Sequence, residues 1–452
     1  MYNARYIIAC LACAAVAVAG KAQHGSISAE MLSKFADDYK PTAAEKALHN
    51  ARNVADINTL AANADTRYTV DDEFSHRVPT KGITNQKSSG RCWLFSGLNV
   101  LRSQAINKYE LNNLELSQAY NFFWDQLEKS NLFLQSVIDS ADKPYDDRRV
   151  TWLFKNPLSD GGQFTGVADI VTKYGVVPWR FMPETYTTEH TSTFSRLLGW
   201  KLREWGLQLR DKAANGATDA QLQADKTEML SQVYRMLTMN FGTPPETFVS
   251  NGKKYTPVTY YNELFGNDLQ NNYVMFMNDP TSPYYKLYEI DLDRHMYDGK
   301  NWTYINVPMS EIKQMAIASI KDSTAMYFSC DVGKYLDRKN GTLDLDNYDY
   351  SALMGTTFNM DKAQRIMTGA SGSTHAMTLC GVDLNDEDKP VKWLIENSWG
   401  ADSGKKGYLV ATDRWMDEYL FRLVVERKFV PEKLLKILNS KPTLLPPWDP
   451  MY

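Results

Sequence analysis

Hydrophobic positions recur at helical spacing over much of the first half of this chain. Residues 94, 98, 101 and 105 are apolar and lie four, three and four positions apart, which predicts one face of an amphipathic helix that begins near Cys92. The same spacing predicts helices over residues 31–39, 43–55, 116–134, 167–174, 194–209 and 222–241. A glycine- and proline-containing stretch, residues 242–248, ends the last of these helices.

The pattern changes to strand-like alternation after residue 372. From residue 375 to residue 382, alternate positions belong to opposite faces of an extended strand. A turn-rich stretch, residues 383–390, separates this run from a second apolar run over residues 391–397. The two runs predict an antiparallel hairpin with its apex near Glu387, which brings His375 and Asn397 to the same end of the hairpin.

The first residues have the pattern of an export signal. Arg5 supplies a positive charge, residues 7–19 form an apolar run that is short for a bilayer span, and small residues suited to cleavage follow. We therefore interpret residues 1–23 as a signal peptide and expect a periplasmic or secreted protein, without stable membrane insertion.

The rest of the chain divides into five segments. Residues 24–67 predict a helical lead-in, and residues 68–194 predict a mainly helical lobe. Residues 195–320 are expected to form a mainly helical insertion, residues 321–430 a β-rich lobe that carries His375 and Asn397, and residues 431–452 a C-terminal tail.

Charge and cysteine content exclude several classes of protein. Fifty basic and fifty-four acidic side chains give a net charge of -4, which argues against a nucleic-acid binder. Cleavage of the signal would leave three of the five cysteines: Cys92, Cys330 and Cys380. An odd number cannot form a closed disulfide framework, whereas a single Cys330–Cys380 bridge would leave Cys92 free. No zinc-type motif is present outside the signal, so we expect no metal and no cofactor.

Cys92 is the candidate nucleophile. A cysteine at a helix N-terminus is expected to favour the thiolate, because the positive end of the helix dipole stabilises negative charge. Ser88 and Ser89 are candidate N-caps, and Gln86 is close enough to donate a side-chain N–H to a developing oxyanion. The alternative is an inert buried thiol, which is common among free cysteines.

His375 and Asn397 complete the candidate site. Histidine takes and returns protons near neutral pH, and a neutral amide can fix its tautomer and ring orientation. Trp399 would shield that hydrogen bond from water. The chain order Cys, His, Asn fits nucleophilic acyl transfer.

These motifs resemble those of a known family. Residues 86–95, Gln-Lys-Ser-Ser-Gly-Arg-Cys-Trp-Leu-Phe, are similar to the active-site signature of papain-like cysteine peptidases of the bleomycin hydrolase and aminopeptidase C branch. Residues 373–377 and 396–400 resemble the histidine and asparagine motifs of that family, and residues 161–163 resemble its glycine pair. The resemblance implies an α+β fold of two lobes, a helical lobe with the cysteine helix and an antiparallel, barrel-like β lobe with His375 and Asn397, plus a large helical insertion.

The resemblance also implies a function. It points to a thiol aminopeptidase acting on peptides, in which Gly161 and Gly162 bind the substrate backbone and Trp399 belongs to the binding region. The tail of the branch lies in the cleft, so Tyr452 is expected to contact the substrate, and a homohexamer is expected. The sequence ends one residue after Met451, where this family commonly continues further, which leaves an endopeptidase as an alternative. The third possibility is a binding or assembly protein without catalytic activity.

Overall fold

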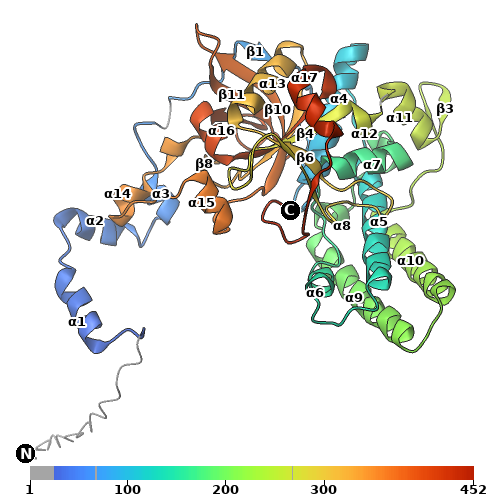
Figure 1. Cartoon of the computed structure of the whole chain (residues 1–452). Coiled ribbons are helices and arrows are strands. Elements are labelled where there is room, and N and C mark those ends of the chain that lie inside the picture. The colour runs from blue at the N-terminus through green and yellow to red at the C-terminus, as the bar shows by residue number, and fades with distance from the viewer. Residues whose placement is uncertain (1–24, 67–68, 267) are drawn as a thin grey trace, which may run out of the picture. The chain divides into compact units, whose positions relative to one another are not determined.

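A computed structural model describes residues 25–66, 69–266 and 268–452 (Figure 1). The chain forms two compact units, the first ending at Ala61 and the second running from Ala62 to Tyr452. The first unit contains α1 (Ala29–Asp38), α2 (Ala43–Ala51) and α3 (Ile57–Ala61). The hydroxyls of Ser28 and Thr42 cap α1 and α2, so both predicted helices are confirmed. The predicted signal peptide lies outside the described residues.

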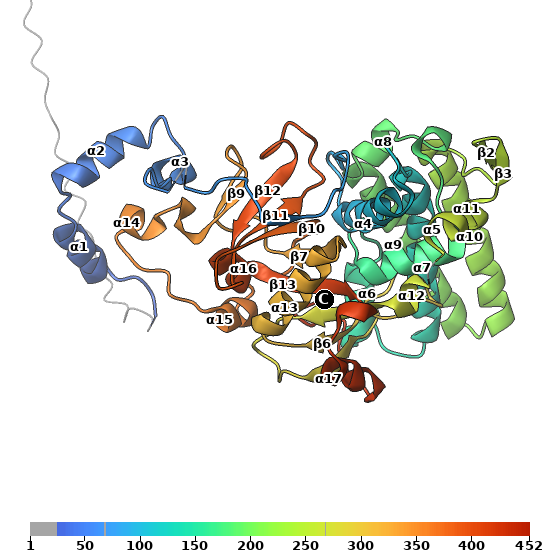
Figure 2. The same ribbon diagram turned by 90° about the horizontal axis from the view of Figure 1, so that it is seen from above.

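The first part of the second unit is a helical lobe, and the large helices predicted from spacing are all present in it. Its helices are α4 (Cys92–Tyr109), α5 (Gln118–Asp139), α6 (Arg148–Lys155), α7 (Phe164–Tyr174), η1 (Trp179–Phe181), α8 (Tyr186–Glu189), α9 (Ser192–Ala214), α10 (Asp219–Phe241), α11 (Pro257–Phe265) and α12 (Leu269–Asn272). Figure 2 shows this lobe beside the sheet of the same unit, with α4 next to the strands.

A large mixed sheet forms the second lobe. In the described part of the chain its strand order is β14-β5-β6-β4-β13-β7-β10-β11-β12-β9-β8, with β1 also paired to β10. The strands are β1 (His76–Arg77), β4 (Tyr273–Met277), β5 (Lys286–Ile290), β6 (Thr303–Asn306), β7 (Met326–Cys330), β8 (Leu336–Asp337), β9 (Thr342–Leu343), β10 (His375–Leu384), β11 (Pro390–Glu396), β12 (Tyr408–Thr412), β13 (Leu420–Glu426) and β14 (Thr443–Leu445).

Shorter elements surround the sheet. A separate hairpin pairs β2 (Phe248–Ser250) with β3 (Lys253–Tyr255). The remaining helices are α13 (Met309–Lys321), η2 (Leu345–Asn347), α14 (Tyr350–Met354), α15 (Lys362–Met367), α16 (Asp413–Tyr419), η3 (Arg427–Phe429), α17 (Glu432–Leu435) and η4 (Lys436–Asn439).

The predicted hairpin is confirmed in its pairing and its register. β10 and β11 are antiparallel, and Leu384 pairs with Pro390, which places the apex at the predicted position. The first eight residues of β10 are all buried, because α4 packs against this strand from the helical lobe and α13 also contacts it. The alternation in the sequence therefore does not correspond to one buried and one exposed face.

Residues 195–320 contain the expected helices and also strands that were not predicted. The segment begins with α9 and α10, but it then supplies β4, β5 and β6 to the large sheet. The physical reason is that the strand residues are buried by their neighbours: Phe276 pairs with Ile305 and with Leu423 of β13. These contacts join parts of the chain that no local pattern connects.

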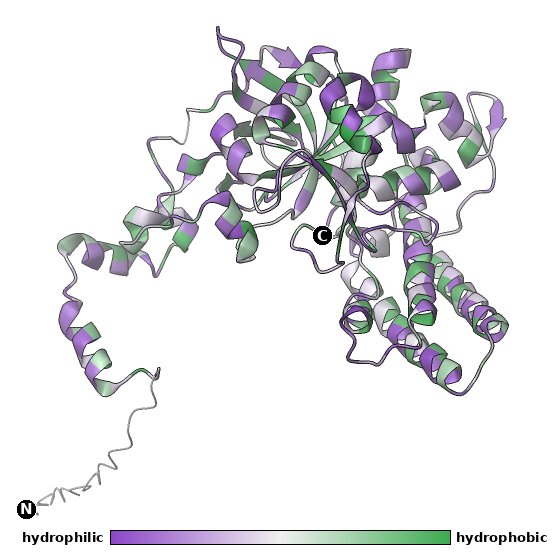
Figure 3. Ribbon diagram, viewed as in Figure 1, coloured by the Kyte–Doolittle hydropathy of each residue, from purple (hydrophilic) through white to green (hydrophobic). Residues whose placement is uncertain are grey.

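Hydrophobic residues form two large clusters in the second unit. One combines the helical lobe with the adjoining side of the sheet and includes Met451 of the tail. The other packs the remaining sheet residues against α13 and α16. Figure 3 shows hydrophobic colour concentrated along the strands and alternating with hydrophilic colour around the long helices. The first cluster therefore holds the helical lobe against the sheet.

Candidate active site

A cavity of about 880 Å³ in the second unit brings together six of the predicted site residues. It is lined by residues from α4, α5, α6 and α9 on one side and from β7, β10 and β13 on the other. The predicted residues among its lining are Gln86, Cys92, Gly161, Gly162, His375 and Tyr452. Side chains separated by up to 366 positions therefore face one space (86 to 452).

Cys92 is the first residue of α4 and is partly exposed to this cavity. The predicted helix start is confirmed, but the predicted serine caps are wrong. Arg91 occupies the N-cap position without a side-chain cap hydrogen bond. The Ser89 hydroxyl instead donates to the Gln86 carbonyl oxygen at 2.6 Å and accepts from Arg91 Nε at 3.0 Å. The serine is used to fold the preceding loop back on itself.

Hydrogen bonds fix the side-chain amide of Gln86 on both sides. Gln86 Nε2 donates to the Ser89 carbonyl at 2.7 Å, and Gln86 Oε1 accepts from the Ser398 hydroxyl at 2.6 Å. The backbone N–H of Gln86 also donates to the Ser398 carbonyl at 2.8 Å. Because Nε2 carries two hydrogens, one hydrogen remains for a ligand in the cavity. This is the arrangement that an oxyanion donor requires.

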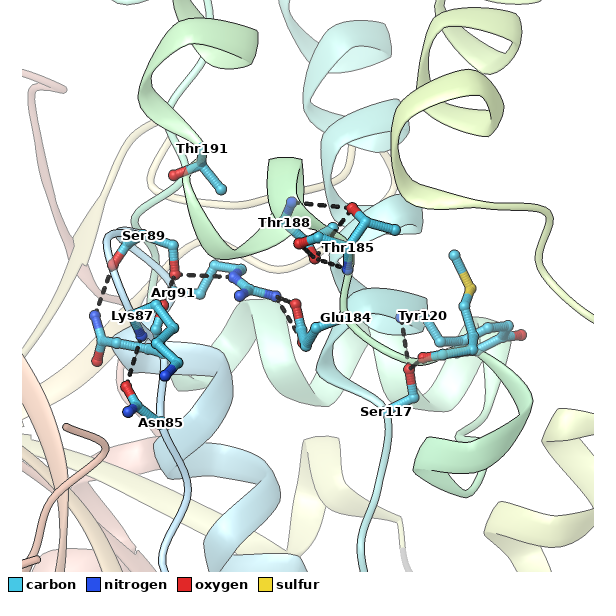
Figure 4. Close-up of polar contacts among 12 residues, drawn as sticks. Asn85, Lys87, Ser89, Arg91, Ser117, Tyr120, Glu184, Thr185, Thr188 and Thr191 are labelled. Carbon is cyan, nitrogen blue, oxygen red and sulfur yellow. Dashed lines mark hydrogen bonds and ion pairs between the residues drawn. The ribbon is translucent and has the colours of Figure 1, made fainter. Parts of the chain in front are cut away.

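A buried ion pair supports the same loop. Arg91 is fully buried, and its Nη1 contacts both carboxylate oxygens of Glu184, at 2.9 and 3.0 Å. Figure 4 shows the Arg91 side chain extended between Ser89 and Glu184, with Thr185 and Thr188 next along the chain. Burial lowers the pKa of Arg91, and the Glu184 carboxylate opposes that shift. The sequence carried no signal for this pair, because its members lie 93 positions apart.

His375 and Asn397 are joined as the hairpin predicted. His375 Nε2 lies 2.9 Å from Asn397 Oδ1, and that oxygen also accepts from the Ser398 backbone N–H at 2.8 Å. Two donors on one amide oxygen fix its orientation, so Nε2 of His375 carries the ring proton. The other ring nitrogen, Nδ1, is then the one that can take a proton.

Trp399 lies over His375 and not in the cavity. The two ring centroids are 4.9 Å apart with an interplanar angle of 32°, so Trp399 contacts the imidazole that it was predicted to shield. Arg338 lies on the Trp399 ring at 4.6 Å from its centroid. Trp399 is not one of the described residues that line the cavity. It therefore supports the imidazole and does not form a wall of the binding space.

Burial controls the protonation of the candidate pair. It raises the pKa of the Cys92 thiol, against an opposing backbone hydrogen bond at Ala376, the residue after His375. Burial also lowers the pKa of His375 to about 4, against the hydrogen bond of Asn397. Burial therefore opposes the thiolate that the helix N-terminus favours. Transfer of the thiol proton to His375 would form two opposite charges together, each of which reduces the cost of burying the other.

The glycine pair and the tail form other parts of the cavity wall. Gly162 is exposed within it, which lets a peptide backbone approach closely. Arg422 on β13 donates to the Met451 carbonyl, Arg148 lies 4.1 Å from the centre of the Trp448 ring, and Tyr452 packs edge-on against Trp152 at 5.3 Å between centroids. The tail is thus held at three points while Tyr452 faces the cavity.

The cysteines away from the cavity are inert in this structure. Cys330 and Cys380 are buried on neighbouring strands and both are free, so the alternative of a bridge between them is wrong. In the described part of the chain, no cluster of His, Cys, Asp or Glu side chains is arranged to hold a metal ion. None of its helices combines the length and apolar character of a membrane span.

Comparisons with known proteins agree with this geometry. The model of the Peptidase C1-like family matches residues 26–452. The chain is 42% identical to bleomycin hydrolase of Mus musculus over 401 residues, covering 84% of this chain and 88% of that one. It is 37% identical to aminopeptidase C of Lactobacillus delbrueckii subsp. lactis over 440 residues, covering 94% and 98%. The crystal structure of PepW from Lactobacillus rhamnosis HN001 superposes with a TM-score of 0.90 at 38% identity, covering 95% and 99%. The fold is papain-like, and the chain belongs to the Peptidase C1-like family.

Proposed function

We propose that this protein is a cysteine aminopeptidase that removes residues from the amino end of peptides. The observation that carries the proposal is one cavity lined by Cys92, Gln86 and His375, with Asn397 hydrogen-bonded to His375 behind the cavity wall and Tyr452 of the tail on that wall. The named similarity to bleomycin hydrolase and aminopeptidase C supports the same activity. No cofactor enters the reaction, because the chain itself supplies the nucleophile, base and oxyanion donor.

The chemistry follows from the positions of these groups. The Cys92 proton passes to Nδ1 of His375, and the sulfur attacks the carbonyl carbon of the peptide bond. Negative charge develops on the carbonyl oxygen, which accepts the remaining Nε2 hydrogen of Gln86. His375 then returns its proton to the leaving amine as the C–N bond breaks. A water molecule, deprotonated by His375, hydrolyses the thioester and restores the thiol.

The tail supplies the restriction to the amino end. Residues 446–452 end against the cavity, and the contacts of Arg422, Arg148 and Trp152 keep them there. A peptide with more than one residue on the amino side of the cleaved bond would need the space that the tail fills. Hydrogen bonds from Lys129 and to Ser159 hold Gly161 in place, and Gly162 is exposed to the cavity, where it binds the backbone of the residue that fits; Tyr452 contacts that residue.

The experiment compares one peptide with a free amino group and its N-acetylated twin, with products identified by mass spectrometry. We expect stepwise removal of single residues from the free peptide and slow cleavage of the acetylated one. Deletion of residues 448–452 is expected to raise internal cleavage of the acetylated peptide. Deletion of Asn251 and Gly252, the exposed turn between β2 and β3, is the matched control. Equal cleavage of both peptides by the parent would make the enzyme an endopeptidase.

We also propose export and self-association. Export rests on the charge and apolar pattern of residues 1–23, and N-terminal sequencing of the protein recovered from the producing cells tests it. Assembly into a homohexamer rests on the resemblance of the motifs to the bleomycin hydrolase branch. Light scattering of the purified protein tests it, since a monomeric mass would exclude the assembly.

A further inference from the structure

His295 was not distinguished from the other histidines by its sequence context, but the structure places it beside the active site. It lies in the connection between β5 and β6, only 3% of its surface is exposed, and it lines the cavity. Its ring lies edge-on to Trp93, with centroids 4.5 Å apart. Trp93 follows Cys92 directly in α4. The imidazole therefore contacts the first turn of the helix that carries the nucleophile.

One carboxylate and one amine of α5 hold this imidazole in place. His295 Nδ1 lies 2.6 Å from Asp125 Oδ1, and Lys129 Nζ lies 2.9 Å from Asp125 Oδ2. Asp125 is fully buried, and Lys129 is 9% exposed. Although burial opposes it, the charge of Lys129 and the contact with His295 lower the pKa of Asp125. Burial and Lys129 lower the pKa of His295, whereas Asp125 opposes this shift. Because Nε2 accepts from a backbone N–H, Nδ1 carries the ring proton and donates to the carboxylate.

The same groups hold the backbone around the glycine pair. Nε2 of His295 accepts from the Gln163 backbone N–H at 3.3 Å. Lys129 Nζ donates to the carbonyl of Gly161 at 2.6 Å and to the carbonyl of Ser159 at 3.0 Å. The backbone on both sides of Gly162 is therefore tied to α5, while Gly162 itself is exposed to the cavity.

The packing leaves no alternative place for the ring. A Cβ added to Gly162 would lie 2.1 Å from His295 Cε1, and one added to Gly166 would lie 2.3 Å from the same atom. The imidazole thus occupies a slot between two glycines, one in the glycine pair and one in the first turn of α7. Glycine at both positions is required by this side chain.

We propose that His295, held by Asp125 and Lys129, is a positioning residue that fixes the Gly161–Gly162 segment relative to Cys92 for peptide binding. The inference rests on the proposed role of the glycine pair in holding the substrate backbone. His295 does not touch the reacting atoms, so its contribution is to the geometry of the bound peptide. A histidine that only filled the core would affect stability without a selective effect on peptide binding.

The test measures KM, kcat and the rate of alkylation of Cys92 by iodoacetamide, a probe too small to need the glycine pair. For His295→Ala we expect KM to rise about tenfold, because the Gln163 N–H and one oxygen of Asp125 lose their partner. We expect kcat to fall less and the alkylation rate to stay within about twofold, since the thiol and its base are unchanged. His295→Gln should recover part of the KM, because an amide can accept from Gln163 and donate to Asp125.

A second variant displaces the ring without removing it. Gly166→Ala adds a Cβ that His295 cannot accommodate, and we expect it to reproduce the rise in KM. Gly381→Ala is the matched control: Gly381 is also buried, and its added Cβ would lie 2.8 Å from Leu394 Cβ, while neither residue lines the cavity. It should lower stability and leave KM unchanged.

Two results would overturn the inference. A parental KM in His295→Ala, His295→Gln and Gly166→Ala would show that the segment needs no such support. Equal losses in kcat and in alkylation, with KM unchanged, would assign His295 to the general integrity of the fold. Failure of the proposed aminopeptidase function is distinguishable, because it would appear in the parent enzyme as equal cleavage of free and N-acetylated peptides.

Discussion

Ser398 orients the amide of Gln86, and its replacement by alanine should slow acyl transfer without touching the nucleophile. The Ser398 hydroxyl donates to Gln86 Oε1 at 2.6 Å, and both residues are buried. The backbone hydrogen bond from Gln86 N–H to the Ser398 carbonyl does not depend on the side chain. Ser398→Ala therefore removes one contact and leaves the loop in place.

The magnitude follows from what the contact does. Loss of an oxyanion donor costs about 10²–10³ in kcat, which is the expectation for Gln86→Ala. Ser398→Ala keeps the Gln86 amide donor, but only the hydrogen bond from Nε2 to the Ser89 carbonyl then orients it. The substitution also leaves Gln86 Oε1 without its partner, and an unpaired buried acceptor costs about 1–3 kcal/mol. We expect kcat to fall about tenfold, which corresponds to about 1.4 kcal/mol in the barrier.

The assay is a double-mutant cycle on kcat for a free-amino peptide. If Ser398 acts through Gln86, Ser398→Ala should have almost no effect in the Gln86→Ala background, so the two losses are not additive. Ser319→Ala is the control, because Ser319 is equally buried and donates one hydrogen bond, to the Thr324 carbonyl, within another part of the fold. Additive losses would refute the reasoning and give Ser398 a role independent of the oxyanion.

Three further outcomes are expected. Cys92→Ala should abolish hydrolysis while circular dichroism remains that of the parent, because it removes the nucleophile and little buried area; residual turnover would contradict the mechanism. Burial lowers the pKa of His375 from its ordinary value of 6.5 to about 4, so the ring stays neutral down to about pH 4. The acid limb of the kcat profile should therefore lie near pH 4, and a limb near pH 6.5 would contradict the lowered pKa. Glu184→Ala leaves the buried Arg91 without its carboxylate and should cost about 3 kcal/mol, measured by urea unfolding, whereas Glu184→Gln should cost less. An unchanged urea midpoint in Glu184→Ala would show that Arg91 needs no partner.

Local patterns were sufficient for the parts of the site that depend on neighbouring residues. The apolar spacing after Cys92 placed this residue at a helix start, because helix periodicity is a property of one continuous segment. The symmetry of two apolar runs about Glu387 placed His375 beside Asn397, since a hairpin converts sequence distance into register. The motifs at Gln86, Cys92, His375 and Asn397 then indicated the family.

The failures concern features that need the solvent environment or a distant partner. Helix position predicted a thiolate at Cys92, but burial raises the pKa of this thiol, and burial depends on packing that the local sequence does not show. The serines before Cys92 matched a cap pattern, yet the local loop used Ser89 for Arg91 and Gln86 instead. The strands β4–β6 were missed because their partners in the sheet are not adjacent in sequence.

By itself, the sequence determined the helices, the hairpin and the identity of the reacting side chains, because each depends on local periodicity or on a contiguous motif. Only the tertiary structure decided which groups support them: Glu184 for Arg91, Ser398 for Gln86, and Asp125 with Lys129 for His295. These partners lie 93, 312 and 170 positions apart in sequence. A buried polar group must find a hydrogen-bond partner wherever the fold brings one, and the packing of the two lobes determines which partner is within reach.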